Sequence, residues 1–376
     1  MHMNPLLTIV IPTRNREYYC IEAIKNILAH DNKNFELVIQ DNSDSNKVEK
    51  FVAEIDDSRL LYNHVIGRIN SVTNMDYALS MATGEYVVMI GDDDTVLSCI
   101  FDVAVWAKDN GYLCVSPSYQ LKYSWPDKLI GESGTLLWRK GTLKTKTLNG
   151  EKQLKRLLKN GIINYSSYLL PKVYHGIVKN DILQKIKKIT GHYIGGLSPD
   201  IYLAVAASIL CREYVVIDYP ITVAGACPRS STAESHKGGH RGELSSAPHL
   251  FGRQYHWDRR IPELYSVETI WAESALKAII ELKRSDLLPK FSQGCFLAGL
   301  IGNNLSLFPL IRDKVKSMDR QRNRISILLS FFLFLNRKAM IRLSRRMFKV
   351  NEYRILNIPN ISIAIEKYDK MLKVNG

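Results

Sequence analysis

Short apolar runs alternate with amphipathic stretches along the first hundred residues of the chain. The apolar runs lie at 7–11, 36–39, 60–65 and 85–90. The stretches between them have helical periodicity, and the first extends from about Glu17 to His30. Short runs that are apolar at successive positions, with helices between them, are typical of parallel strands covered on both faces. We therefore expect a β-α-β-α-β-α-β series that builds a mainly parallel sheet in an α/β fold.

The pattern changes after this series. No clean period is visible from 116 to about 164, whereas apolar positions predict helices at 181–189 and 199–207 and a strand at 215–217. Residues 225–255 are rich in Gly, Ser, His and Arg, which indicates a long loop over the site or a linker. Everything beyond Val267 has helical character. The predicted organisation is an α/β domain at 1–225, a loop or linker at 226–266, and a basic helical region at 267–376.

Polar residues follow three of the predicted strands. They are Pro12 to Asn15, Asp41 to Ser43, and Asp92 to Asp94. Open parallel sheets bind their ligands at the carboxyl ends of the strands. These three groups therefore mark the expected ligand-binding edge of the sheet.

The net charge and the cysteine content indicate which partners and which cellular compartment to expect for this protein. The formal net charge of +14 suits a phosphorylated substrate, an anionic membrane surface or another polyanion, although it also serves plain solubility. Six cysteines without a C-x-x-C pair indicate a reducing compartment and no zinc module. The N-terminus lacks the pattern of a signal peptide. We therefore expect a cytoplasmic protein.

The carboxylate triplet Asp92, Asp93 and Asp94 is the most distinctive local motif. Mg²⁺ and Mn²⁺ prefer oxygen ligands and usually take one or two carboxylates together with water and substrate phosphates. Gly91-Asp92-Asp93 is also a good turn or capping sequence. The triplet alone leaves a metal site and a structural turn both open.

The N-terminal third resembles the inverting, family-2-like glycosyltransferases of the GT-A fold, of the bacterial surface-polysaccharide type. The matching motifs, which agree in order and spacing, are Thr8 to Arg16, Glu36 to Ser43, Asn74 to Ala78, Ala82 to Tyr86 and Gly91 to Asp94. The resemblance implies a nucleotide-sugar donor, an Mn²⁺ or Mg²⁺ cofactor and transfer to a hydroxyl of a glycan, a polyol-phosphate or a lipid-linked saccharide.

The resemblance also implies roles for individual residues. The metal ligands would be Asp94 and Asp92. The nucleotide-binding residues would be Pro12, Thr13, Arg14, Asp41, Asn70, Asp76, Asp92 and Asp93. For Asp41 the alternative is an Asx-turn that closes the strand. Asp76 stands where the family often carries Asn.

Ser198-Pro199-Asp200 begins a predicted helix about a hundred residues after the triplet, where such transferases keep their general base. The resemblance assigns that role to Asp200, and the alternative is a helix cap. His236 and His240 lie in the Gly-rich loop, where they could serve a metal, a diphosphate or neither.

The apolar stretch 325–335 has basic flanks and is too short to span a bilayer as a helix. It could contact lipid at the inner face of the membrane, or pack in the C-terminal region or at an oligomer seam. No nucleic-acid partner is expected. Two rival functions stay open: a nucleotidyltransferase, for which a Gly-rich phosphate loop is missing, and a basic membrane- or polyanion-binding scaffold without enzymatic activity.

Overall fold

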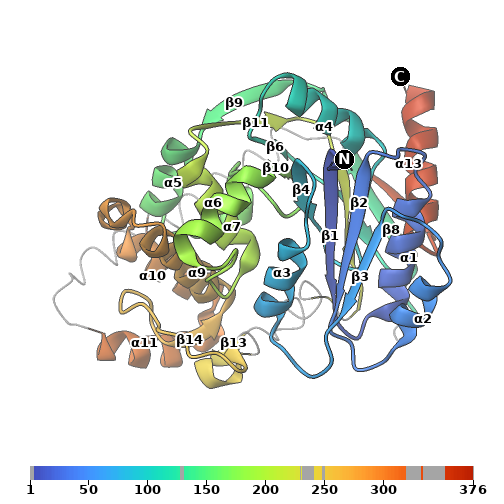
Figure 1. Ribbon diagram of the computed structural model, residues 1–376. Helices are drawn as coiled ribbons and strands as arrows, with labels where there is room; N and C mark the ends of the chain where they lie inside the picture. The colour runs from blue at the N-terminus through green and yellow to red at the C-terminus, as the bar shows by residue number, and fades with distance from the viewer. Residues whose placement is uncertain are drawn as a thin grey trace.

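The computed structural model describes residues 4–127, 131–228, 230, 241–247, 250–318, 332 and 352–375. An eight-stranded sheet runs through the molecule in the order β3-β2-β1-β4-β10-β6-β11-β9 (Figure 1). Its strands are β1 (Leu7–Thr13), β2 (Phe35–Asp41), β3 (Leu60–His64), β4 (Tyr86–Met89), β6 (Cys114–Pro117), β9 (Thr145–Asn149), β10 (Ile177–Lys179) and β11 (Glu213–Ile217).

Most of these strands run in one direction. β1 pairs in parallel with β2 and β4, β2 pairs in parallel with β3, and β11 pairs in parallel with β6. β10 is antiparallel to both β4 and β6, so β6 and β11 point the same way as β1. The predicted α/β class with a mainly parallel central sheet is confirmed.

Each central strand contributes side chains to two hydrophobic cores, because successive side chains point to opposite faces of a sheet. In β1, Val10 faces one core, and Ile9 and Ile11 face the other. Helices cover both faces, as the sequence predicted. On the Ile9 side these are α1 (Glu17–Leu28), α2 (Lys47–Ala53) and α4 (Cys99–Asp109). On the Val10 side these are α3 (Ser71–Ser80), α5 (Gly150–Lys159), α6 (Asn180–Thr190), α7 (Pro199–Leu210), α9 (Val267–Glu281), α10 (Gln293–Asn303) and α11 (Phe308–Ser317).

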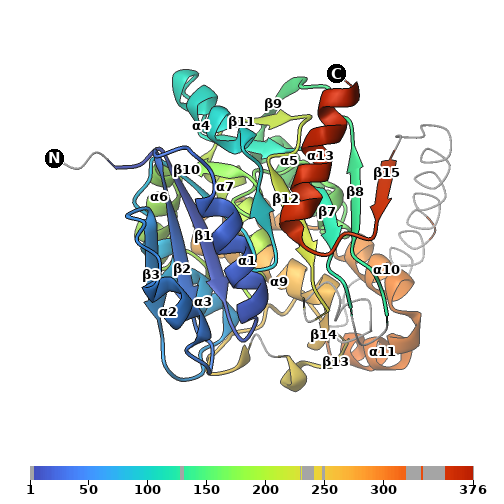
Figure 2. The same cartoon turned by 90° about the vertical axis from the view of Figure 1, so that its right-hand side faces the viewer.

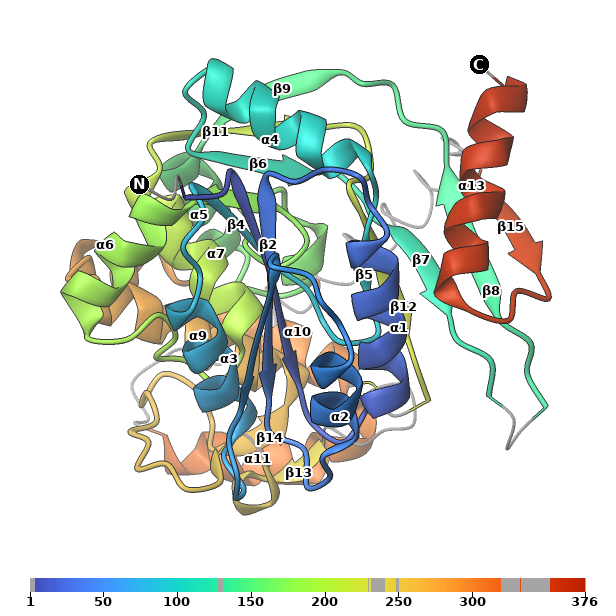
Figure 3. The same cartoon turned by 45° about the vertical axis from the view of Figure 1, so that its right-hand side comes forward.

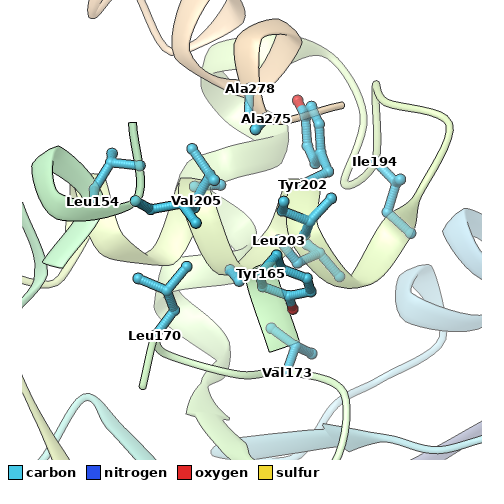
Figure 4. Close-up of a cluster of buried hydrophobic side chains, with 14 of the residues drawn as sticks. Leu154, Tyr165, Leu170, Val173, Ile194, Tyr202, Leu203, Val205, Ala275 and Ala278 are labelled. Carbon is cyan, nitrogen blue, oxygen red and sulfur yellow. The ribbon is translucent and has the colours of Figure 1, made fainter. Parts of the chain in front are cut away.

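Helix α7 lies at the centre of the Val10-side core. Every side chain from Ile201 to Ser208 is buried, which is the pattern of a helix that is enclosed by protein on all sides. Figure 4 shows Tyr202, Leu203 and Val205 of α7 among side chains from several other elements, including Ala275 and Ala278 of α9. Helix α9 therefore belongs to the same core as the sheet.

The C-terminal residues return to the N-terminal part of the chain. A second sheet has the order β15-β8-β7-β12-β5, and its strands are β5 (Thr95–Val96), β7 (Leu121–Ser124), β8 (Thr135–Arg139), β12 (Thr222–Ala226) and β15 (Glu352–Leu356). Helix α13 (Ile361–Asn375) packs on this sheet and lies beside α1 (Figures 2 and 3). The expectation of helix alone beyond Val267 was wrong at β15, because a five-residue edge strand depends on its partner β8 and leaves little local signal.

Shorter elements complete the described chain. β13 (Arg241–Glu243) pairs with β14 (Leu264–Ser266). The 3-10 helices are η1 (Tyr165–Ser167), η2 (Leu244–Ser246), η4 (Ser285–Lys290) and η5 (Leu305–Leu307). His236, His240 and the stretch 325–335, except residue 332, lie outside the described residues. Across the described segments no single helix is both long and apolar enough to cross a membrane, but the bent pair Gln293–Asn303 and Leu305–Lys316 passes that test jointly.

Candidate active site

The carboxyl ends of β1, β2 and β4 lie side by side, because the three strands are parallel neighbours. This brings Thr13, Asp41 and Asp92 to one edge of the sheet. The hydroxyl of Thr13 donates to Asp92 Oδ2 at 2.6 Å, and both side chains are buried. The sequence prediction that these strand ends form one edge is confirmed.

Arg16 binds the first two carboxylates of the triplet. Its Nη2 lies 2.6 Å from Asp92 Oδ1 and its Nε lies 3.1 Å from Asp92 Oδ2. Its Nη1 lies 3.6 Å from Asp93 Oδ1. Burial raises the pKa of Asp92, and the guanidinium of Arg16 acts in the opposite direction. A buried carboxylate pair is thus held together by one cation.

Asp94 is anchored by protein groups on both oxygens. Oδ2 accepts from the backbone N–H of Gly91 at 2.6 Å and from the hydroxyl of Tyr174 at 3.0 Å, and it lies 3.3 Å from His175 Nε2. Oδ1 accepts from the backbone N–H of Gly225 at 2.6 Å. Burial alone would raise the pKa of Asp94, but His175 and these hydrogen bonds outweigh it and the pKa is lowered.

Asp93 is less fully engaged than Asp94. Its Oδ2 accepts from the backbone N–H of Cys227 at 2.9 Å, and its backbone carbonyl accepts from Trp125 Nε1 at 2.9 Å. Gly225 passes so close that a Cβ there would lie 1.8 Å from the Asp93 carbonyl oxygen, so only glycine fits. Strand β12 therefore closes over the triplet from a distant part of the sequence.

Among the described residues, the triplet does not form a metal site made by protein side chains alone. In the described part of the chain, no group of three or more His, Cys, Asp or Glu side chains could hold a metal ion. Asp94, one of the two predicted metal ligands, has both oxygens engaged by protein donors. The carboxylates do fit a cation that takes most of its oxygen ligands from the phosphates of a bound nucleotide. The metal-ligand roles of Asp92 and Asp94 stay predictions. The hydrogen bonds that Asp94 accepts from protein donors argue against a role for Asp94 as a metal ligand.

A cavity of about 340 Å³ opens beside the triplet. It is lined by Pro12, Thr13, Arg14, Arg16, Asn42, Arg68, Ile69, Asn70, Ser71, Asn74, Met75 and Phe251. Thr13 and Arg16 belong to this lining and also contact Asp92, so the triplet adjoins the cavity. Four of the predicted nucleotide-binding residues, Pro12, Thr13, Arg14 and Asn70, are brought together here.

The cavity suits an anion with polar groups. Its lining includes Arg14, Arg16 and Arg68, and it contains the first residues of α3, whose N-terminus carries a partial positive charge. Asn74 donates from Nδ2 to the carbonyl of Thr13 at 3.1 Å, while its buried Oδ1 has no hydrogen-bond donor among the described residues. A buried acceptor of this kind is usually satisfied by a ligand or by water.

Asp41 and Asn70 have structural bonds at this edge. Asp41 Oδ1 accepts from the backbone N–H of Ser43 at 2.7 Å, which is the Asx-turn considered as the alternative, and Oδ2 accepts from Tyr62 Oη at 2.9 Å. Asn70 caps α3 by accepting from the backbone N–H of Thr73 at 2.9 Å. Asn70 still lines the cavity, whereas Asp41 does not. Their nucleotide-binding roles stay predictions.

Asp76 serves a different segment of the chain. It lies outside the cavity lining, and its Oδ1 accepts from the backbone N–H groups of Tyr193 at 2.7 Å and Ile194 at 2.9 Å. A carboxylate accepts such bonds more strongly than the amide that the resemblance led us to expect at this position. Asp76 therefore ties α3 to the segment that leads into α7, and these contacts do not support the nucleotide-binding role.

Asp200 is the second residue of α7 and is half-buried. It accepts a hydrogen bond from the hydroxyl of Ser198, and burial raises its pKa above the usual value. The segment before it is anchored by Ser274 of α9, whose Oγ accepts from the backbone N–H groups of Leu197 at 2.9 Å and Ser198 at 2.8 Å. A carboxylate with a raised pKa on a firmly held helix start suits a general base.

Several residues of this site were not selected from the sequence. Arg16 was noticed only as part of a motif, although its place three residues after β1 is a usable signal. Tyr174 and His175 reach Asp94 from a segment eighty residues away, and Phe251 reaches the cavity from the long loop. Distant partners of this kind leave no local pattern in one sequence.

Comparison with known protein families matches residues 8–160 to the family described as Glycosyl transferase family 2. WcaA of Escherichia coli (strain K12), whose name assigns it to colanic acid biosynthesis as a glycosyl transferase, is 34% identical over 96 residues, which are 25% of this chain and 34% of that protein. The GalNAc(5)-diNAcBac-PP-undecaprenol beta-1,3-glucosyltransferase of Campylobacter jejuni is 31% identical over 114 residues, 29% of this chain and 36% of that protein. The matched stretch thus spans about a third of each relative.

Among solved structures, S. aureus TarS 1-349 in complex with UDP-GlcNAc has a TM-score of 0.46 at 13% identity, over 86% of this chain and 89% of that chain. The mannosyltransferase PcManGT from Pyrobaculum calidifontis, in complex with GDP-Man and Mn²⁺, has a TM-score of 0.38 at 15% identity, over 88% and 87%.

Proposed function

We propose that this chain transfers a sugar from a nucleotide-sugar donor to a hydroxyl of a glycan or related acceptor, because residues 8–160 match the family described as Glycosyl transferase family 2. The arginine-lined cavity beside the buried triplet is the observation that carries the proposal. Two relatives that carry names of sugar transferases support bacterial surface-polysaccharide synthesis as the setting.

The donor would lie in the 340 Å³ cavity. Its diphosphate would meet Arg14, Arg16 and Arg68, because guanidinium groups bind phosphate oxygens in a fixed geometry, and the N-terminus of α3 favours the same charge. The base and ribose would meet the Pro12-Thr13 loop and the open Oδ1 of Asn74. These contacts would orient the anomeric carbon toward the acceptor.

A divalent metal, Mn²⁺ or Mg²⁺, is part of the proposal. It would be held by the donor's phosphates and one carboxylate of the triplet, and we choose Asp93 because Asp94 accepts hydrogen bonds from protein donors on both oxygens. When bound, the metal would neutralise negative charge on the departing diphosphate. Arg16 already offsets part of the charge of Asp92 and Asp93.

Transfer would proceed by one displacement. Asp200 takes the proton from the acceptor hydroxyl as that oxygen forms its bond to the anomeric carbon. The bond from the anomeric carbon to the diphosphate breaks, and its electron pair leaves on the phosphate oxygen. A single attack from the opposite side inverts the configuration at that carbon.

The proposal also covers the acceptor, the cellular location and the oligomeric state. The acceptor is a glycan, a polyol-phosphate or a lipid-linked saccharide. We place the enzyme in the cytoplasm, in contact with the inner face of the membrane when the acceptor is lipid-linked, and the net charge of +14 supports contact with anionic partners. A homo-oligomer formed through the C-terminal region is also part of the proposal.

The test is a donor screen followed by a matched pair of variants. UDP-, GDP- and dTDP-sugars are incubated with the full chain and Mn²⁺ or Mg²⁺, and release of the nucleoside diphosphate is measured. Asp200→Asn should lower the rate at saturating donor by about 10²- to 10⁴-fold while donor affinity is unchanged. Asp181→Asn is the control, because Asp181 also lies in the first turn of a helix, α6.

Two results would contradict the proposal. Absence of release from every donor, with a folded protein, would remove the sugar-transfer function. Near-normal transfer by Asp200→Asn, or equal loss in Asp181→Asn, would move the general base away from Asp200.

A further inference from the structure

A second and larger cavity, of about 900 Å³, lies between α5 and the C-terminal end of α7, and we name it the α5–α7 cleft. Its lining residues are Asn149, Glu151, Lys152, Gln153, Lys155, Arg156, Lys159, Asn160, Ser208, Ile209, Leu210 and Arg212. Its volume is in the range of pockets that enclose a small molecule. None of the predicted site residues contributes to it.

The cleft lies on the opposite edge of the sheet from the candidate active site. Arg212 precedes β11, which is parallel to β1, and so it lies at the amino ends of the parallel strands. Asn149 ends β9, which is antiparallel to β11, and so it lies at the same edge. Asp200 and Leu210 stand at the two ends of α7, a separation of roughly 15 Å at 1.5 Å per residue. A ligand in the cleft would not occupy the donor cavity.

The charge in the cleft is strongly positive. Five lining residues are basic and one, Glu151, is acidic. Glu151 is already neutralised by Lys155 at 2.5 Å and by Arg284 at 3.0 Å. Lys152, Arg156, Lys159 and Arg212 are exposed, and none has an ion pair in the described part of the chain. Four cations that have no counter-charge among the described residues therefore share one concave site.

The arrangement of these cations is set by helix geometry. Lys152, Arg156 and Lys159 follow one another at intervals of four and three residues, which places them in a row on one face of α5. Leu154, Leu157 and Leu158 on the other face are buried and fix the helix against the core. Like charges in a row repel one another, and a bound anion would relieve that repulsion.

The other lining groups suit a sugar. Asn149, Gln153 and Asn160 carry amides, which both donate and accept hydrogen bonds as sugar hydroxyls do. Ile209 and Leu210 add apolar surface for the C–H face of a ring. We propose that the α5–α7 cleft binds a phosphorylated saccharide, at a site separate from the donor cavity. The phosphate part rests on the charge of the cleft, and the saccharide part also draws on the proposed function.

The shape of the site favours a small ligand over a membrane. The cations line the walls of a hollow, and a flat bilayer surface reaches such walls poorly. Binding of vesicles through these residues is therefore an outcome that would overturn the proposal.

The experiment compares three variants of the full chain by calorimetry at low ionic strength, with glucose 1-phosphate, inorganic phosphate and glucose as probes. Lys152→Gln/Lys159→Gln removes two cleft cations. Lys185→Gln/Lys188→Gln removes two exposed cations from α6 and serves as the matched control. Arg14→Gln/Arg68→Gln removes two cations from the donor cavity. Circular dichroism and melting curves establish that all three are folded.

We expect glucose 1-phosphate to bind more tightly than inorganic phosphate, and glucose not to bind measurably. The cleft variant should bind glucose 1-phosphate at least tenfold more weakly, and the α6 control should match the unmodified chain. Equal affinity in the cleft variant, loss confined to the donor-cavity variant, or no preference for the sugar phosphate would overturn the proposal. So would cleft-dependent binding to phosphatidylglycerol vesicles without binding of the sugar phosphate. These measurements use no nucleotide sugar, so they are independent of the transfer assay.

Discussion

Removal of the Ser274 hydroxyl should loosen the segment that carries Asp200. Ser274 is fully buried, and its Oγ accepts from the backbone N–H groups of Leu197 and Ser198 while donating to the carbonyl of Ile270 at 2.7 Å. Gly196 allows this approach, because a Cβ there would lie 2.8 Å from the Cβ of Ser274. Ser274→Ala leaves both N–H groups without an acceptor.

The magnitude follows from the desolvation of those two donors. A buried N–H without an acceptor costs about 1–3 kcal/mol, so Ser274→Ala should destabilise the folded chain by about 2–5 kcal/mol. Ser208→Ala is the matched control, since Ser208 is also buried in a helix and donates to the carbonyl four residues earlier at 2.7 Å. No backbone N–H depends on Ser208 among the hydrogen bonds of the described residues, so its loss should cost under about 1 kcal/mol.

Two measurements test this reasoning. Urea unfolding followed by circular dichroism compares the variants, and amide hydrogen exchange reports the segment around Leu197 and Ser198 directly. A loss of about 2 kcal/mol in local stability raises exchange there by roughly 30-fold. Sugar transfer should slow in Ser274→Ala, with the affinity for nucleoside diphosphate unchanged. Equal stability and equal exchange in Ser274→Ala and Ser208→Ala would refute the argument.

Three further predictions concern single carboxylates. Asp41→Ala should lower the free energy of unfolding by about 2–4 kcal/mol, because Ser43 N–H and Tyr62 Oη lose their acceptor. It should also lower the affinity for nucleoside diphosphate. A loss of stability without a loss of affinity would leave the Asx-turn as the sole role of Asp41. Burial raises the pKa of Glu273 to about 7. The native state therefore holds this proton more tightly than the unfolded chain does. The free energy of unfolding should fall by up to about 3 kcal/mol as the pH rises from about 4.5 to 7. Glu273→Gln should flatten this dependence in thermal melts, and an unchanged pH profile would exclude Glu273 as its source. Removal of divalent metal by EDTA should weaken nucleoside diphosphate binding, as should Asp93→Asn, whereas equally tight binding in EDTA would exclude the metal.

The motifs of the N-terminal third are readable because each one lies next to its strand. Thr83 and Gly84 show that residues of the same motifs also stabilise the fold. Their backbone N–H groups donate to Glu36 Oε1, and Gly84 N–H also donates to Thr8 Oγ1 at 2.8 Å. Part of the resemblance therefore reflects a buried hydrogen-bond cluster that joins β1, β2 and β4. The same pattern of residues serves folding and ligand binding together.

The individual roles of the acidic residues were harder to predict. Asp41, Asp76 and Asp94 were each assigned to ligand binding, and each accepts at least two hydrogen bonds from protein groups. The donors come from other parts of the chain in most cases. For Asp94 the donor Gly225 lies 131 residues away. A carboxylate that follows a strand can be identified in a sequence, but its partners cannot.

The sequence by itself determined the parallel direction of the first four long strands, the edge where their polar residues meet, and Asp200 at the start of a helix. These features depend on hydrophobic periodicity and on residues close together in the chain. The tertiary structure alone decided that Arg16 pairs with Asp92, that Ser274 of α9 anchors the Asp200 segment, and that β15 and α13 return to β8 and α1. It also placed around the α5–α7 cleft four cations that have no ion pair among the described residues. Such contacts join residues far apart in sequence, and only the packing of the whole chain brings them within bonding distance.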